Sequence, residues 1–109
     1  MRADGIPDDV RALIDEHLES VLELDVLLAV TRRRGVTAVT DVARELRMNE
    51  PAMAAALDKL AASGLLSRDG DEYTFAPGEP GLAYAVAALE QAYARRRVRV
   101  IEAIYAPPA

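Results

Sequence analysis

One run of the sequence, Thr40 to Phe75, constrains the fold more than any other. It reads TDVARELRMNEPAMAAALDKLAASGLLSRDGDEYTF. The run predicts a short helix, a tight turn, a longer helix and a hairpin of two short strands. We expect Thr40 to cap the first helix, about Asp41 to Arg47, because Ser, Thr, Asn and Asp are the preferred residues at that position.

The second half of the run carries the clearer start and stop signals. Asn49 is expected to cap the longer helix, which has Pro51 in its first turn and Gly64 at its end. The inward positions of this helix are spaced by four and three residues and are Met53, Leu57 and Leu60. A turn Asp69-Gly70-Asp71 between two short runs is a strong hairpin signal.

Two helical segments are expected before this run. Pro7-Asp8-Asp9 opens the first, with carboxylates at the positive end of the helix dipole. Ser20 either starts a second helix, Val21 to Arg34, or lies in a bend of one continuous helix. A short edge strand is expected over Val36 to Val39. The positions expected to face inward are Val10, Leu13, Ile14, Leu18, Leu22, Val26, Leu27 and Val30.

The last predicted element is one long helix, Leu82 to Tyr105, which Pro107-Pro108 is expected to end. Its length is roughly 36 Å at a rise of about 1.5 Å per residue. A compact domain of this size has a radius of gyration of about 13 Å. We therefore expect the helix to extend past its own domain and to need a second surface that covers part of its apolar stripe.

Composition narrows the class of protein. The 109 residues are enough for one domain, and a hydrophobic content of 51% with 5% aromatics favours a mostly α protein built on Leu, Val and Ala. Cysteine is absent, which excludes disulfides and thiolate metal sites. No apolar stretch reaches the length of a membrane span, and MRADGIPDD lacks a signal region, so we expect a cytoplasmic protein.

The segment from Val36 to Ala76 resembles the winged helix-turn-helix superfamily, most closely the small MarR- and ArsR-type transcriptional regulators. The resemblance implies one winged-helix domain over residues 1–109. Its expected parts are N-terminal helices over 8–34, the helix-turn-helix and wing over 36–76, and a C-terminal dimerisation helix over 82–105. The residues that carry the resemblance are Val42, Ala43, Leu46, Met48, Asn49, Met53, Leu57, Leu60, Gly64, Leu65 and Leu66.

The same resemblance implies a homodimer that binds duplex DNA, with the second helix of the motif in the major groove. Asn49 is a candidate base reader, although its first expected role is the helix cap. The candidate phosphate contacts are Arg47, Lys59, Arg68, Arg32, Arg33 and Arg34. The charge distribution argues against DNA binding, because residues 32–78 hold 7 bases and 7 acids, whereas DNA-binding surfaces are usually basic.

The helix in the reading position also has few hydrogen-bond donors, since it carries Glu50, Pro51, Asp58 and several alanines. This pattern supports an alternative hypothesis, a winged-helix module that binds another protein and binds DNA weakly or not at all. An Ala54-Ala55 surface would let a partner helix approach closely. The absence of a catalytic motif leads us to expect no enzyme activity, and we expect no cofactor or metal.

The dimer prediction rests on the two ends of the chain. Residues 1–31 are strongly acidic, with 8 acids and 2 bases, whereas arginines gather at 95–97 and 99. The acids and the arginines either pair with each other across a dimer, or the arginines make an additional DNA contact. We favour the pairing across a dimer. The candidate interface residues are Leu82, Val86, Leu89, Tyr93, Arg96, Val100, Ile104, Leu13 and Leu18.

Overall fold

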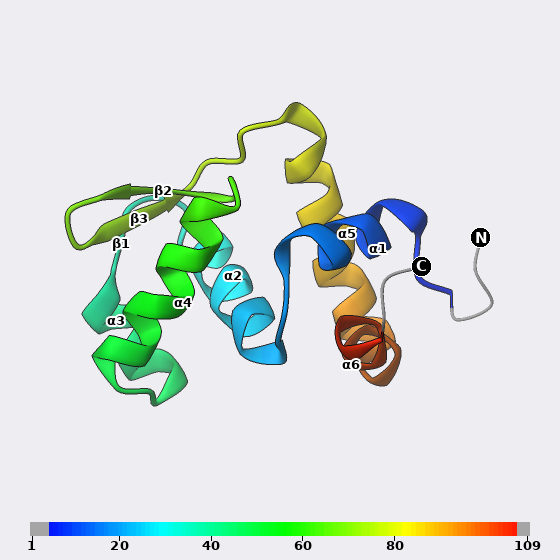
Figure 1. Cartoon of the computed structure of the whole chain (residues 1–109), viewed down its shortest axis with the longest axis horizontal. Helices are drawn as coiled ribbons and strands as arrows, with labels where there is room; N and C mark the ends of the chain where they lie inside the picture. Colours follow the sequence, from blue (N-terminus) through cyan, green and yellow to red (C-terminus); the bar gives the residue numbers. More distant parts are fainter. Residues whose placement is uncertain (1–4, 107–109) are drawn as a thin grey trace. The chain divides into compact units, whose positions relative to one another are not determined.

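The computed structural model describes residues 5–106, and this part of the chain is mostly helical (Figure 1). It contains six helices and one small antiparallel sheet of three strands. The chain forms two compact units: a middle unit, Leu22–Gly78, and a terminal unit built from both ends of the chain, 5–21 and 79–106. None of the described helices combines the length and hydrophobicity needed to cross a membrane.

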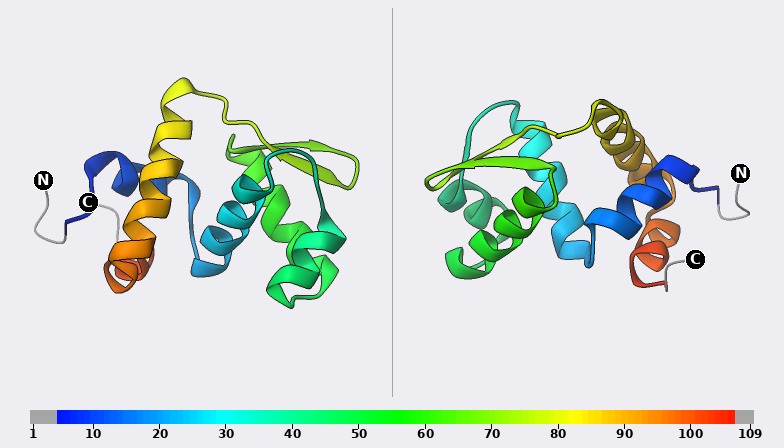
Figure 2. Two further views of the ribbon diagram at one scale, coloured as in Figure 1. Left: turned by 180° about the vertical axis from the view of Figure 1, so that it is seen from behind. Right: turned by 45° about the horizontal axis from the view of Figure 1, so that its top comes forward.

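The middle unit places three helices around one side of the small sheet (Figure 2). The strand order is β1-β3-β2, so the last strand of the hairpin is the central one. Thr37 lies opposite Tyr73, and Leu66 lies opposite Phe75. The elements are α2 (Val21–Arg33), β1 (Thr37–Ala38), α3 (Val39–Leu46), α4 (Glu50–Ala62), β2 (Leu66–Asp69) and β3 (Glu72–Phe75).

The caps of α3 and α4 differ in how well they were predicted. The predicted cap at Thr40 is wrong, because α3 already begins at Val39 and no side chain caps it. The backbone N–H of Val39 donates to the Asp71 carbonyl at 3.3 Å, so pairing with the hairpin sets this helix start. The cap at Asn49 is confirmed: its side-chain oxygen accepts a hydrogen bond from the Ala52 N–H at 2.8 Å.

The core of the middle unit lies between the helices and the sheet. Met53, Leu57 and Leu60 of α4 are fully buried, as their spacing predicts. The helix α2 is enclosed on most of its surface, since every residue from Val26 to Val30 is buried. Leu22 is an exception to the prediction, with 38% of its surface exposed, because it lies on the one side of the first turn of α2 that the buried Glu23 and Leu24 do not share.

The terminal unit consists of α1 (Asp8–His17), α5 (Pro80–Arg95) and α6 (Arg97–Tyr105). The predicted continuous helix from Leu82 to Tyr105 is wrong, because the backbone leaves helical geometry at Arg96 with φ −136° and ψ 53°. The bend lets α5 and α6 both pack against α1. The predicted stop at Pro107-Pro108 lies outside the described residues.

The start of the chain resolves the alternative left open at Ser20. Leu18 is extended, with φ −120° and ψ 126°, so α1 ends there and α2 is a separate helix. The Val21 N–H donates a hydrogen bond to the Tyr105 hydroxyl at 3.2 Å within the terminal unit.

Gly64 follows the end of α4 in a left-handed conformation, which favours glycine over residues with a side chain. Its φ is +95°, and the Leu65 N–H behind it donates to the Leu60 carbonyl at 3.1 Å. No atom lies within 4 Å of a Cβ built at this position, so a side chain would meet conformational strain and no steric clash.

We therefore predict that Gly64→Ala lowers the free energy of unfolding by about 1–2 kcal/mol. Gly81→Ala is the matched control, because a Cβ there also meets nothing within 4 Å and its φ is not left-handed. In the first turn of α5 it should be neutral or stabilise by up to about 1 kcal/mol. Urea denaturation of both variants measures the difference, and equal effects would contradict the strain at Gly64.

Candidate nucleic-acid interface

The candidate interface is the exposed face of α4 with the turn before it and the β2–β3 hairpin after it. Asn49 is exposed, but its side-chain oxygen is held by the cap, which leaves only its amide nitrogen to donate outward. In the first two turns of α4 the exposed residues that follow it are Glu50, Pro51 and Ala55. A negative charge and two side chains without donors give this part of the face little hydrogen-bonding capacity for base edges.

Lys59 forms an ion pair inside the middle unit. Its Nζ lies 3.4 Å from Oε2 of Glu23 on α2, and Glu23 is only 7% exposed. A buried carboxylate is costly unless a positive group or hydrogen bonds offset the loss of water. Lys59 is therefore committed in part to neutralising Glu23, a buried acid that the sequence pattern did not reveal.

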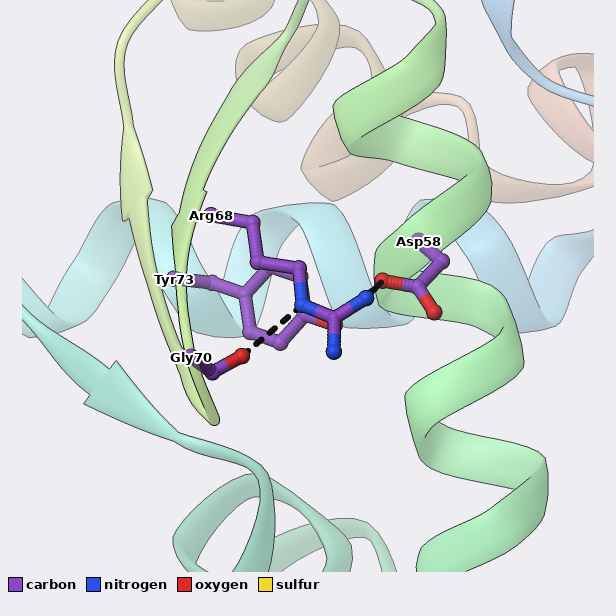
Figure 3. Close-up of polar contacts among 4 residues, drawn as sticks. All are labelled: Asp58, Arg68, Gly70 and Tyr73. Atoms are coloured by element: carbon purple, nitrogen blue, oxygen red, sulfur yellow. Dashed lines mark hydrogen bonds and ion pairs between the residues drawn. The ribbon is translucent and has the colours of Figure 1, made fainter.

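Arg68 is held between the hairpin and α4 (Figure 3). One terminal nitrogen lies 3.0 Å from Oδ1 of Asp58, and its Nε donates to the Gly70 carbonyl at 2.8 Å. The guanidinium also lies over the Tyr73 ring, with its carbon 5.9 Å from the ring centre. Arg68 thus ties the hairpin to α4, which reduces the charge it can offer to a phosphate.

The Tyr73 hydroxyl completes this cluster by donating to the same Asp58 oxygen at 2.5 Å. Tyr73 is 1% exposed. Burial, and then the hydrogen bond and negative charge of Asp58, raise the pKa of Tyr73 from its ordinary value of 10.0 to about 12, although Arg68 acts against them. Asp58 and Tyr73 were not among the predicted site residues.

Arg33 is paired with α3. Its guanidinium lies 2.7 Å from Oε1 of Glu45 and 3.5 Å from the Asp41 carbonyl. The pair holds the end of α2 beside α3, which is a structural role for one of the three predicted arginines. Arg32 is exposed and takes part in interactions of its own.

Three arginines near α3 differ from these paired cations. Within residues 5–106, the side chains of Arg34, Arg44 and Arg47 make no ion pair or hydrogen bond. All three are exposed. Arg34 and Arg47 have positive φ angles of 49° and 56°, and no other described residue except glycine does. The sequence pattern pointed to Arg34 and Arg47 but missed Arg44.

Acidic residues surround the other half of the face. Asp69, Asp71 and Glu72 at the hairpin tip are all exposed, and Glu50 and Asp58 lie on α4. The cations of the middle unit that have no hydrogen bond or ion pair with the described residues therefore lie at the ends of α2 and α3, and not on α4 or the hairpin. This arrangement suits contact with a phosphate backbone at one edge better than the reading of bases by α4.

Most of the residues predicted for the dimer interface are buried inside the single chain. Within the chain itself, Leu13, Leu18, Val86, Leu89, Tyr93, Val100 and Ile104 are all buried. Leu82 is half-buried and Arg96 is exposed. The apolar members thus form the core of the terminal unit, because the bend at Arg96 covers the stripe that a straight helix would have left open.

Comparison with known proteins adds no assignment: no protein-family model, no curated protein and no solved structure matches this chain. In the described part of the chain, no three His, Cys, Asp or Glu side chains come together as a metal site. The functional argument therefore rests on the residues of the candidate interface.

The raised pKa of Tyr73 is directly testable by alkaline titration of tyrosine absorbance. Tyr73 should ionise near pH 12, well above the ordinary tyrosine value of 10.0. Because the folded state holds this proton more tightly than the unfolded chain, the associated stability is present below about pH 10 and is lost as the pH rises towards 12. Tyr73→Phe should remove the late phase, and a late phase that persists would refute the assignment.

Proposed function

We propose that this chain is a winged-helix transcriptional regulator that binds duplex DNA as a homodimer in the cytoplasm. The order α2, β1, α3, α4, β2, β3 supports the winged-helix assignment, with α4 in the position of the reading helix and the β2–β3 hairpin as the wing. The DNA contact is made mainly through phosphates at Arg34, Arg44 and Arg47, and Asn49 can add one donor from its amide nitrogen.

The observation that carries this proposal is the strained backbone of two unpaired arginines. A left-handed residue other than glycine costs about 1–2 kcal/mol, and glycine is the usual residue at a helix C-terminus in this conformation. Arg34 and Arg47 both occupy such positions, and neither side chain forms a hydrogen bond or ion pair with the described residues. Strain of this kind is typical of functional sites, and an exposed guanidinium is suited to phosphate.

We predict that Arg47→Gly weakens DNA binding while it leaves the free energy of unfolding unchanged or raises it. Glycine relieves the strain, and the variant loses one phosphate contact per chain. The slope of log affinity against log salt should become shallower by about 1 for each lost contact. Fluorescence anisotropy with a labelled duplex of mixed sequence, between about 50 and 200 mM salt, measures that slope.

Two control variants separate a phosphate contact from a general charge effect. Arg47→Lys keeps the charge and should retain most of the affinity. Arg99→Gln removes the same charge from an arginine that already pairs with Glu102 at 3.3 Å, and should change the slope little. Absence of duplex binding by the unaltered chain at low salt would eliminate the DNA proposal.

The homodimer is proposed to form through the exposed side of the terminal unit. Tyr84 on α5 and Val98 on α6 are 80% and 68% exposed, so both are available to the surface of a second copy. The acids of α1 and the arginines at 95–97 complement each other in charge, so two copies can pair with opposite charges facing.

Tyr84→Glu is therefore expected to convert the dimer to a monomer, because a charge at the centre of an apolar contact is costly. Val36→Glu is the matched control, since Val36 is 62% exposed in the middle unit and lies outside the proposed contact. Light scattering gives the molar mass of each variant. A monomeric unaltered chain would contradict the dimer without affecting the phosphate contact.

A second function is favoured by the acidic hairpin and the small residues of α4. Under this alternative, the winged-helix module docks on a basic segment of another protein through Ala54-Ala55, Asp69 and Asp71. Ala55→Arg distinguishes the two functions. The added cation should strengthen duplex binding in the DNA regulator, whereas it should displace a stoichiometric basic partner that copurifies with the unaltered chain.

A further inference from the structure

The terminal unit contains an open groove that the proposed DNA contact does not use. It lies between the segment before α1 and the C-terminal half of α5, and its volume is about 700 Å³. Small and apolar residues form one part of the groove and two adjacent arginines form another. The residues on which the inference rests are Gly5, Pro7, Ala88, Ala92, Arg95 and Arg96.

Of the four arginines at 95–97 and 99, the two that line the groove are the ones without an internal partner among the described residues. Arg97 lies over the Tyr93 ring, with 4.7 Å between the guanidinium carbon and the ring centre, and Arg99 pairs with Glu102. In the described part of the chain, by contrast, the side chains of Arg95 and Arg96 form no hydrogen bond or ion pair. Two adjacent like charges without a counter-charge repel each other, and a bound anion would relieve that repulsion.

The backbone at this corner adds to the positive potential. Arg96 is the residue from which α6 starts, and no side chain caps that start. The first N–H groups of a helix and its dipole both favour a negative charge nearby. The N–H groups and the dipole at the start of α6 add to the positive potential of the arginines without touching a ligand.

Gly5 fixes the place of one guanidinium. Its φ is +77°, and a Cβ built on it would lie 2.7 Å from Nε and 2.8 Å from the guanidinium carbon of Arg96. The backbone before α1 therefore passes close to this group. A glycine with this conformation allows the close approach and keeps Arg96 at the edge of the groove.

The rest of the lining is suited to an apolar body and not to a bare ion. Ala88 and Ala92 lie one helical turn apart on α5, and both are half-buried. Pro7 faces the groove from the segment before α1, and the exposed Gln91 supplies the remaining amide. Ligand sites commonly combine such an apolar lining with a few convergent polar groups.

We propose that this groove binds an amphipathic organic acid, with its carboxylate on Arg95 and Arg96 and its aliphatic chain along Pro7, Ala88 and Ala92. The planar fork of arginine matches a carboxylate with two parallel hydrogen bonds. Short side chains at Ala88 and Ala92 leave the space that the aliphatic chain occupies. The site is independent of the DNA contact, which lies in the middle unit.

Isothermal titration of the full chain with octanoate tests the proposal. Saturable binding of one octanoate per chain is the expected result. Octanamide keeps the chain without the charge, and acetate keeps the charge without the chain; each should bind at least about tenfold more weakly, the factor that corresponds to about 1.4 kcal/mol. Inorganic phosphate serves as a third probe and should bind as weakly as acetate.

Variants locate the site. Arg95→Gln should weaken octanoate binding about tenfold or more, and Ala92→Leu should block it by filling the groove with both arginines intact. Arg97→Gln is the matched control, because this neighbouring arginine does not line the groove, and it should bind octanoate normally. Thermal melting followed by circular dichroism shows whether each variant is folded; if Ala92→Leu is not, Ala88→Leu replaces it.

Several outcomes would overturn the proposal. Equal binding of acetate and octanoate would mean that the arginines attract any small anion. Equal binding of octanamide would mean that the charge has no role, and normal binding by Ala92→Leu would place the ligand elsewhere. No binding of octanoate would remove the site, and none of these results depends on whether the chain binds DNA.

Discussion

The hydrogen bonds to the Asp58 carboxylate hold together the candidate interface of the middle unit. One oxygen of this carboxylate accepts hydrogen bonds from the Tyr73 hydroxyl and from Arg68, which come from the two strands of the hairpin. The cluster therefore fixes the hairpin against α4 (Figure 3). It also affects the charge of the face, because it neutralises the one arginine of β2, and the acids at the hairpin tip have no ion pair with the described residues.

Pairing of cations explains why charge counts alone are a poor guide to this surface. Residues 32–78 are neutral in total, yet Arg33, Lys59 and Arg68 each have a carboxylate partner within the middle unit. The exposed pairs of Arg33 and Arg68 contribute little to stability, about 0–1 kcal/mol each, but pairing reduces the charge that an arginine can offer to a phosphate. The remaining positive charge lies at the ends of α2 and α3, so the edge of the domain, and not α4, carries the proposed contact.

Much of the fold could be predicted from local signals, and the errors have identifiable physical causes. The Asn49 cap, the Gly64 stop and the Asp-Gly hairpin were found because each depends on residues close in sequence. The start of α3 was missed because a backbone bond to Asp71, distant in sequence, overrides the cap at Thr40. The break at Arg96 was missed because apolar spacing continues across it, and neither Pro nor Gly marks it. Of the candidate site, Asn49, Arg34 and Arg47 were accessible to sequence reasoning, whereas the partners of Lys59 and Arg68 depend on tertiary packing.

The bend at Arg96 connects the two surfaces of the terminal unit. In a straight helix, the apolar stripe through Leu89, Tyr93 and Val100 would need a second chain to cover it. Because α6 turns back onto α1, the chain covers the stripe itself, and the arginines that interrupt the stripe are brought to the corner between the helices. An arginine in the middle of an apolar stripe cannot enter the core without a partner. The arginines at 95–97 therefore favour the bend. Two of them, Arg95 and Arg96, lie beside the groove without a hydrogen bond or ion pair in the described part of the chain, so a ligand there would bind to the feature that gives this unit its shape.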